Sequence, residues 1–411
     1  MNKIICGVII LLTLSLISFL FVGCGDEVTS SLWDADKVTA PNPVITQITP
    51  PDSSLAGITI LTIAGQNFSP NVDNNFVYFD EHKVDVITAS ETELTLKTPN
   101  IIGDSIQIKI AVHGAENFSN IVYYILEYTA YEYGGIDHFS DAYGLAYDNE
   151  NNVYVSLGSY DILQITPEEE QVTYVTGAPG FFKMMKMGPG GVLYTGRTKF
   201  IYQVPPGGGS IEKFGAKLTK SVNDFDFDTN GNIFVASKDG IYCVKTDGTN
   251  NLSLDCASYN LKSIRVYNGY VYVAGDYSGA ETNEAKKGIW RCKITSSTGD
   301  LDVLELAFNW SDFAGEYGAN ILSLTFNING DMYVGADAEA AITVIFPNAD
   351  GNYTNGETET LYPDVLQPQS TVLCWDNGNY LFVNRKGPLD EDKRLIRVTM
   401  PTKGAPYYGR Q

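Results

Sequence analysis

Ten charged and aromatic residues in irregular segments of the chain have side chains of the kinds that contact ligands. Arginine and lysine bind anionic groups, aspartate accepts hydrogen bonds, and tyrosine and tryptophan offer flat apolar faces with a polar edge. We therefore predict that these residues contact a ligand; the alternative for each is an ordinary solvated loop residue. The set is Tyr160, Arg197, Lys199, Lys238, Asp276, Tyr277, Trp310, Tyr317, Arg385 and Lys386.

Metal and covalent chemistry have little support in the sequence. The segment from Asp226 to Gly231 imitates the start of a calcium loop, but its twelfth position is Ser237, where such a loop needs a bidentate glutamate. The same segment fits a hairpin turn better. Of the three histidines, only His138 lies in the long C-terminal region, which argues against a histidine-rich zinc site or a histidine-based lyase. There is no Gly-x-Ser-x-Gly motif. We therefore predict no metal and no cofactor, and enzymatic activity is not favoured.

The elements that must position the candidate residues repeat six times after residue 130. Each unit contains an apolar triplet that follows a turn rich in glycine and asparagine, which supply the positive φ of tight hairpins. The central residues of successive triplets are 39, 41, 38, 61 and 49 positions apart. Six units of about four strands predict a six-bladed β-propeller over residues 131–411. The triplets occupy residues 153–155, 192–194, 233–235, 271–273, 332–334 and 381–383.

Strand parity assigns the loops of such a propeller to two faces. Turns between first and second strands emerge on one face and are short. Second-to-third loops and blade connections emerge on the other face and carry the long insertions, Ala274 to Lys287, Phe308 to Asn320 and Asn384 to Lys393. Length variation on one face predicts that ligands bind there. We also expect Tyr131 to Gly134 to supply the outer strand of the last blade, because closure protects the exposed edge of the ring.

The repeat resembles NHL-type propellers, most visibly from Tyr143 to Asp148 and in the triplet at 153–155. The resemblance implies the fold and says little about function. Gluconolactonase-like propeller enzymes hold a cation in the central channel with acidic and amide residues. No such set can be aligned here, although four residues lie near the corresponding edge, namely Asp141, Asn223, Asp224 and Asn320.

A smaller all-β domain is predicted over residues 43–128. Several of its short strands alternate strictly, as in residues 106–110, which is typical of strands with one buried face. The segments Ile45–Pro50, Leu61–Phe68 and Leu94–Pro99 resemble the IPT/TIG family of immunoglobulin-like domains. The resemblance implies a β-sandwich that acts as a spacer or interaction module.

The N-terminal residues resemble a bacterial lipoprotein signal. A short basic start precedes an apolar run that ends at Phe21-Val-Gly-Cys24, a sequence similar to the lipobox, although phenylalanine replaces the usual leucine. This predicts a signal peptide at 1–23, a lipid on Cys24 and a tether at 24–42. An uncleaved membrane anchor is the alternative. Asp26 and Glu27 resemble surface-export signals but could equally be ordinary linker charges.

Cys243 and Cys256 lie on consecutive predicted strands on either side of one turn and could face each other. They could form a disulfide in an oxidising compartment or remain two buried free thiols, and the second alternative is favoured.

The formal net charge of −22 disfavours nucleic acid and anionic lipid surfaces as partners. A polyanion would need a local patch, whereas a neutral glycan could use the many aromatic residues. The leading hypothesis is an outer-membrane lipoprotein that faces the cell exterior and binds a polysaccharide for a neighbouring uptake complex. The alternatives are a gluconolactonase- or lyase-type enzyme with a channel metal, and a protein-binding scaffold.

Overall fold

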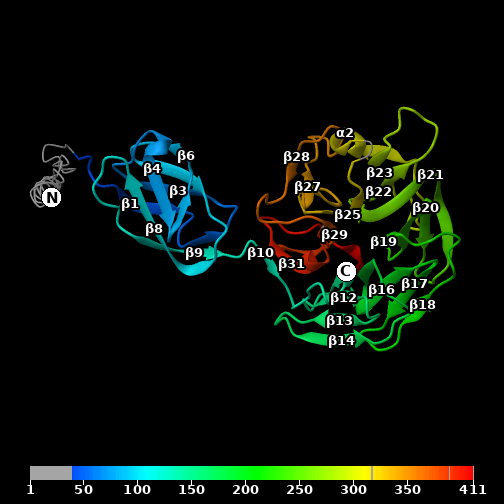
Figure 1. Ribbon diagram of the computed structural model, residues 1–411. Coiled ribbons are helices and arrows are strands. Elements are labelled where there is room, and N and C mark those ends of the chain that lie inside the picture. Colours follow the sequence, from blue (N-terminus) through cyan, green and yellow to red (C-terminus); the bar gives the residue numbers. More distant parts are fainter. Residues whose placement is uncertain (1–38, 316–317, 388, 411) are drawn as a thin grey trace, which may run out of the picture.

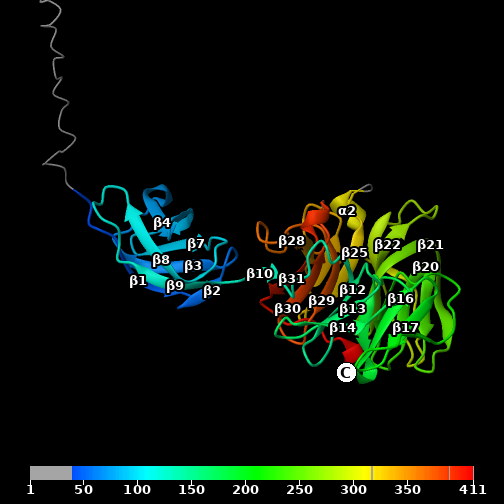
Figure 2. The same cartoon turned by 60° about the horizontal axis from the view of Figure 1, so that its bottom comes forward.

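The computed structural model describes residues 39–315, 318–387 and 389–410, and it places almost all regular structure in β-strands (Figure 1). The smaller domain is a sandwich of two sheets, visible from a second direction in Figure 2. One sheet has the order β1 (Val44–Thr49), β3 (Ile60–Gln66), β7 (Glu93–Lys97) and β6 (Val86–Ala89). The other has the order β2 (Ser53–Leu55), β9 (Val122–Glu127), β8 (Gly103–Val112), β4 (Asn75–Phe79) and β5 (His82–Val84). A short 3-10 helix, η1 (Val72–Asn74), precedes β4.

The sandwich core follows from the alternation seen in the sequence. Along β8, Ile106, Ile108 and Ile110 are buried, while the residues between them are partly exposed. They belong to one buried cluster with Leu61 of β3 and Leu94 of β7. Period-two burial is what packs one face of a strand against the opposite sheet.

The larger domain is a ring of blades, each built from antiparallel neighbours (Figure 1). The structure confirms the all-β prediction of an Ig-like sandwich followed by a six-bladed propeller. Blades one and two are β11 (Ala142–Tyr147), β12 (Val153–Leu157), β13 (Ile162–Ile165), β14 (Gln171–Val175), β15 (Met185–Gly188), β16 (Val192–Arg197), β17 (Phe200–Val204) and β18 (Glu212–Phe214). Blades five and six are β25 (Ile321–Phe326), β26 (Met332–Ala336), β27 (Ile342–Ile345), β28 (Thr358–Thr360), β29 (Ser370–Trp375), β30 (Tyr380–Arg385), β31 (Arg394–Thr399) and β10 (Ala130–Glu132).

Blades three and four share one continuous sheet. Its strands are β19 (Asp224–Phe227), β20 (Ile233–Val244), β21 (Asn250–Tyr267), β22 (Tyr270–Tyr277), β23 (Lys287–Lys293) and β24 (Glu305–Phe308). β20 turns at Asp239, whose φ is 74°, and so holds two strands of blade three. β21 completes blade three and continues as the first strand of blade four. The pairing of Lys238 with Asn260 joins the two blades where the sequence predicted separate sheets.

The last blade closes the ring as the sequence predicted, with the closing strand displaced slightly toward the N-terminus. β10 pairs with β31, so that Tyr131 lies opposite Arg397. Thr129, which precedes β10, donates from its hydroxyl to the Ala56 carbonyl of the sandwich at 2.5 Å. Its own carbonyl accepts from the Thr399 amide at 2.8 Å. The same short segment therefore closes the propeller and connects it to the sandwich.

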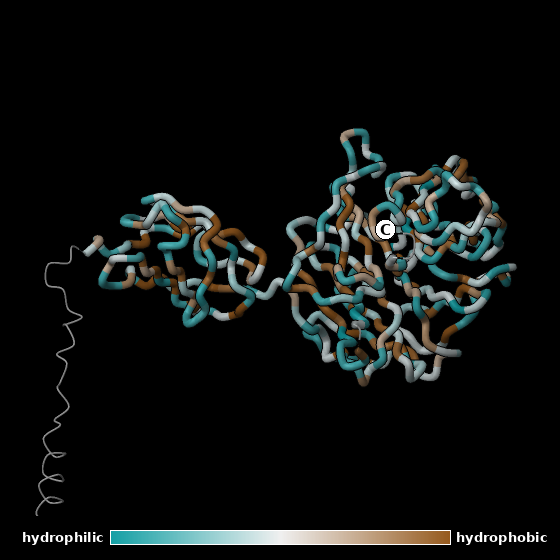
Figure 3. The backbone as a smooth tube through the Cα atoms, turned by 45° about the horizontal axis from the view of Figure 1, so that its top comes forward, coloured by the Kyte–Doolittle hydropathy of each residue, from teal (hydrophilic) through white to brown (hydrophobic). Residues whose placement is uncertain are grey.

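Hydrophobic residues concentrate in the strands of both domains, whereas many loops are hydrophilic (Figure 3). Three of the described cysteines, Cys243, Cys256 and Cys292, are buried, and all are free thiols. Cys243 and Cys256 therefore form no disulfide in this structure. Among the described residues, no helix is both long and apolar enough to cross a membrane.

The C-terminal segment lies across one end of the central channel. After β31 the chain returns toward the centre of the ring and ends in η4 (Tyr408–Arg410) (Figure 1). The Ala405 amide donates to the Phe326 carbonyl of blade five at 2.9 Å, and Asn149 of blade one donates to the Arg410 carbonyl at 2.8 Å. Asn149 belongs to a first-to-second turn, so the face with the short turns is the one that this segment covers.

Candidate functional site

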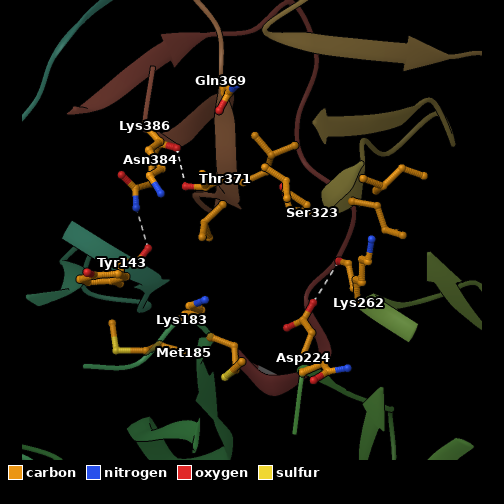
Figure 4. Close-up of a pocket in the computed structure, with 18 of the residues that line it drawn as sticks. Tyr143, Lys183, Met185, Asp224, Lys262, Ser323, Gln369, Thr371, Asn384 and Lys386 are labelled. Atoms are coloured by element: carbon orange, nitrogen blue, oxygen red, sulfur yellow. Dashed lines mark hydrogen bonds between the residues drawn. The ribbon is translucent and has the colours of Figure 1, made fainter. Parts of the chain in front are cut away.

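A cavity of about 750 Å³ occupies the opposite end of the channel, on the face with the long loops. Figure 4 shows its side chains converging from several blades. The lining comes mainly from the segments where the first strand of each blade begins. These are residues 141–143, 183–186, 222–224, 260, 262–263, 321–324, 369 and 371–373, joined by Asp337, 384–386 and Lys393.

The alternation along β19 shows how a first strand serves both the core and the cavity. Phe225 and Phe227 are fully buried, and the ring of Phe227 lies 5.2 Å from that of Tyr194 in blade two. Asp224 and Asp226 point the other way, toward blade four. Period-two alternation therefore gives one face of the strand to apolar packing and the other to polar contacts between blades.

The two aspartates form a double clasp between blades three and four. Asp224 Oδ2 accepts from the Ser263 hydroxyl and the Ile264 amide, each at 3.0 Å. Asp226 Oδ2 accepts from Arg265 Nη1 at 2.5 Å and from the Val266 amide at 2.8 Å. Burial raises the pKa of Asp224, although the positive charge of Lys186 and then the Ile264 amide oppose that shift. Both carboxylates thus serve to hold neighbouring blades together.

Asparagine amides make further clasps at the same level. Asn384 Nδ2 donates to the Tyr143 carbonyl at 2.6 Å and joins blade six to blade one, as the dashed line in Figure 4 shows. Asn223 Nδ2 donates to the Leu261 carbonyl at 2.6 Å and joins blade three to blade four. Asn320 Oδ1 accepts from Lys262 Nζ at 3.1 Å and joins blade five to blade four, while its Nδ2 donates to Asp337 Oδ2 within blade five at 2.8 Å. Much of the polar lining is therefore already engaged in holding the ring.

Asp141 forms an ion pair at the rim. Its Oδ1 lies 2.9 Å from Lys393 Nζ, and its Oδ2 accepts from the Tyr143 hydroxyl at 3.0 Å. Burial acts to raise the pKa of Asp141, but the hydrogen bonds from Lys393 and Tyr143 outweigh it and lower the pKa. The same bond raises the pKa of Lys393. The Tyr143 ring stacks on Phe181, with centroids 4.1 Å apart.

The basic side chains of the lining divide into two groups. Lys262 lies 2.7 Å from Asp276, and Arg385 Nε donates to the Asp392 carbonyl at 2.8 Å. By contrast, the amines of three further lining lysines have neither a hydrogen-bond acceptor nor a carboxylate partner among the described residues. These are Lys183, Lys186 and Lys386.

The carboxylates of the lining do not fit a shared metal ion. Asp141, Asp224 and Asp337 each bond to separate protein donors. Within the described ranges, no three His, Cys, Asp or Glu residues are grouped closely enough to hold a metal ion. The calcium-like segment forms a hairpin turn instead, in which Asp228 Oδ1 accepts from the amides of Asn230 and Asn232, both at 2.8 Å.

The structure distributes the ten predicted ligand residues widely. Arg385 and Lys386 line the cavity. Asp276 does not line it but forms an ion pair with Lys262, which does. The remaining loop residues lie outside the lining: Tyr160 is 48% exposed, and Lys199 donates to the Thr219 carbonyl. Arg197, which donates to the Pro179 carbonyl, and Lys238, which pairs with blade four, also lie outside it. Tyr317 and the lipidation site Cys24 lie outside the described residues.

Two of the aromatic candidates are core residues, which corrects the expectation that they contact ligand. Trp310 is fully buried at the start of α2 (Trp310–Ala314), and its indole nitrogen donates to the Ala319 carbonyl at 2.8 Å. Tyr277 is 8% exposed and packs on Tyr259 with ring centroids 4.9 Å apart. Their loop positions suggested exposure, but Trp310 begins a helix that packs inward, and Tyr277 is the last residue of β22, which extends into the predicted loop and pairs with β21.

Several lining residues escaped the sequence reasoning, notably Lys183, Lys186, Lys262 and Gln369. A signal for them existed. The sequence places Asn223 and Asp224 near the channel edge; they lie at the start of the first strand of blade three, and Lys183 and Lys186 flank the start of the first strand of blade two.

Comparison with known proteins supports the two-domain fold. Residues 43–130 match the IPT/TIG domain family. A search of the curated proteins finds no match. Among solved structures, a putative phosphatase from Bacteroides thetaiotaomicron is 13% identical, with a TM-score of 0.52, covering 88% of this chain and 98% of that chain. A putative gluconolactonase is 13% identical, with a TM-score of 0.50, covering 68% of this chain and 94% of that chain.

An auxiliary nutrient binding protein from Bacteroides thetaiotaomicron is also 13% identical, with a TM-score of 0.49, and covers 87% of this chain and 97% of that chain. Identity this low concerns the fold and not the activity. Residues 43–130 are thus an IPT/TIG domain, and the six-bladed β-propeller that follows carries the candidate site.

Proposed function

We propose that the propeller binds an extracellular saccharide in the cavity at the mouth of its channel. The observation that carries this proposal is the convergence of polar side chains from the blades on one cavity of about 750 Å³. That volume falls in the range of small-ligand sites. Amides and hydroxyls such as Asn260, Gln369 and Thr371 match the donors and acceptors of a sugar, and the aromatic ring of Tyr143 stands at the rim.

The position of the cavity also supports binding. It lies on the face that carries the long insertions, whereas the C-terminal segment covers the other end of the channel. A ligand would therefore enter from one side only. Because the blades are clasped to one another by Asp224, Asn223 and Asn384, the site is formed before the ligand arrives. Such preorganisation reduces the entropy lost on binding.

Titration of the lipid-free protein, residues 25–411, against a panel of plant and host glycans tests the proposal. Asn260→Ala removes an amide that lines the cavity. We expect this variant to lower the affinity for the bound glycan about tenfold, the loss typical of one hydrogen bond. Asn329→Ala is the matched control, because Asn329 is exposed in a first-to-second turn on the opposite face. The proposal would be contradicted if no glycan of the panel binds, or if both variants lose affinity equally.

The proposal extends to the location of the protein. A lipid on Cys24 would hold the chain at the outer membrane, with the IPT/TIG domain as a spacer and the propeller facing outward beside an uptake complex. The sequence Phe21-Val-Gly-Cys24 supports this. Labelling cells with a radioactive fatty acid should mark the wild-type protein and not a Cys24→Ala variant. Protease added to intact cells should degrade the propeller; protection from the protease would argue against surface exposure.

A further inference from the structure

We infer that the cavity selects a saccharide that carries an acidic group, bound by Lys183, Lys186 and Lys386. This inference rests on the proposed function and adds the chemical class of the ligand. The acidic group is a carboxylate, as in a uronic acid, or a sulfate, since either accepts hydrogen bonds from ammonium groups.

The charges of the lining lead to this inference. Six lining residues are basic and three are acidic, although the whole chain has a formal net charge of −22. The cavity lining therefore has a net positive formal charge, opposite in sign to the net charge of the whole chain. The acidic members are Asp141, Asp224 and Asp337, and the basic members are Lys183, Lys186, Lys262, Arg385, Lys386 and Lys393.

Hydrogen bonding removes most of these charges from consideration as ligand contacts. The Asp141 carboxylate is paired with Lys393, Asp224 is satisfied by blade four, and Asp337 is held by Asn320. Lys262 is paired with Asp276. What remains without a hydrogen bond or an ion pair among the described residues is positive, namely the amines of Lys183, Lys186 and Lys386. Lys186 attracts the Asp224 carboxylate, and Lys386 the Asp141 carboxylate, only from beyond ion-pair distance.

These amines come from two blades. Lys183 and Lys386 lie near Tyr143, whereas the Lys186 amine is 6.0 Å from the centroid of the Tyr407 ring in the C-terminal segment. Lys183 and Lys186 begin blade two, Lys386 follows β30 in blade six, and blade one lies between them. Figure 4 shows Lys183 and Lys386 on either side of Tyr143. A sugar ring placed near the Tyr143 ring would therefore bring its acidic group within reach of lysines from two blades. Clustered cations in a concave site focus the field on an anion.

The strongly negative remainder of the protein restricts which anions are suitable. The net charge of the whole chain disfavours long polyanions, whereas a short acidic oligosaccharide or a chain end can contact the lysines of the lining alone. The inference is therefore for a ligand with few acidic groups, held by direct contacts.

Calorimetric titration of the lipid-free protein with three probes of equal length tests the inference. The probes are trigalacturonate, its methyl ester, and a sulfated neutral trisaccharide. We expect at least one acidic probe to bind and the methyl ester to bind at least tenfold more weakly. Affinity for the acidic probe should also fall when sodium chloride is raised from 50 to 500 mM, because salt screens the lysine charges.

Charge-removing variants locate the contact. Lys183→Gln and Lys386→Gln should each lower the affinity for the acidic probe about tenfold, in line with the loss of one charge-assisted hydrogen bond. Lys293→Gln and Lys403→Gln are matched controls, because both lysines are exposed near the opposite face, and they should leave affinity unchanged. Thermal melting of each variant separates loss of binding from loss of folding.

Each outcome decides a different point. Binding of a sulfated probe alone keeps the inference and identifies the group as sulfate, and binding of trigalacturonate alone identifies it as carboxylate. Equal binding of trigalacturonate and its ester, with the sulfated probe silent, overturns the inference but leaves saccharide binding intact. Unchanged affinity in folded Lys183→Gln and Lys386→Gln also overturns it. If neither the probes nor any glycan of the panel bind, both this inference and the proposed function fail.

Discussion

Replacing Arg265 with methionine should destabilise the propeller more than any exposed charge substitution. Arg265 Nη1 lies 2.5 Å from Asp226 Oδ2, and the two side chains are 5% and 0% exposed. The guanidinium also lies 5.1 Å from the centroid of the Tyr407 ring, in the C-terminal segment that covers the channel. Arg265 therefore joins blade three, blade four and the channel end through one side chain.

The expected cost follows from the burial of the pair. Methionine preserves the apolar stem of Arg265 but leaves Asp226 as a buried carboxylate without its counter-charge, and such losses cost about 3–5 kcal/mol. Urea unfolding of the lipid-free protein, followed by tryptophan fluorescence, measures the change. With a slope of about 3 kcal/mol per molar urea, the midpoint should fall by about 1 M or more.

A second substitution shows whether the unpaired charge causes the loss. In the double variant Arg265→Met/Asp226→Asn, the amide oxygen can still accept from the Val266 amide, which lies 2.8 Å from the Asp226 carboxylate, but the charge is gone. We expect it to recover part of the lost stability. Arg291→Met is the control, since its partner Glu305 is 53% exposed and such pairs contribute about 0–1 kcal/mol. A loss below about 1 kcal/mol in Arg265→Met, or no recovery in the double variant, would refute the reasoning.

Further predictions concern the thiols, the rim ion pair and ring closure. Burial raises the pKa of Cys243 to about 11 and of Cys256 and Cys292 to about 12, so these thiols should resist a disulfide reagent at pH 8 until the protein unfolds. If fewer than the four thiols of residues 25–411 react after unfolding without reductant, a disulfide is present. The pKa of Asp141 is lowered below its ordinary value of 3.8, so its ion pair stabilises the fold above that value and is lost as the pH falls through the lower, folded-state pKa. Asp141→Asn should therefore flatten the fall in melting temperature below about pH 4, and an unchanged profile would contradict this. Starting the chain at Gly135 removes β10 and exposes the edge of β31, so unfolding should lose cooperativity; a truncated protein that melts like the parent would contradict this.

Much of the fold could be predicted because it is written in local patterns. Tight turns rich in asparagine and glycine, each followed by an apolar triplet, mark the hairpins of the blades, and their recurrence gives the blade number. Strand parity then identified the face on which the cavity lies and placed Arg385 and Lys386 near it. The closing strand could be predicted because a ring without it would leave the edge of β31 exposed.

The members of the site could be predicted only in part. Trp310 and Tyr277 were expected to contact ligand because they fall in the long insertions of one face, yet both are buried, Trp310 at the start of α2 and Tyr277 at the end of β22. Asp226 looked like part of a metal loop, and its role as the partner of Arg265 depends on a residue of the next blade. Burial in an insertion and pairing between blades are long-range properties that a local pattern does not contain.

By itself, the sequence determined the strands, the turns, the sixfold repetition and the IPT/TIG domain, because strand period and turn chemistry are set by neighbouring residues. The tertiary structure alone decided which charges in the cavity are compensated. Lys183 and Lys386 lie far apart in the chain and approach the same cavity only once blade six closes on blade one. Whether a lysine keeps its charge free for a ligand depends on every carboxylate that folding brings near it, and that is a property of the closed ring.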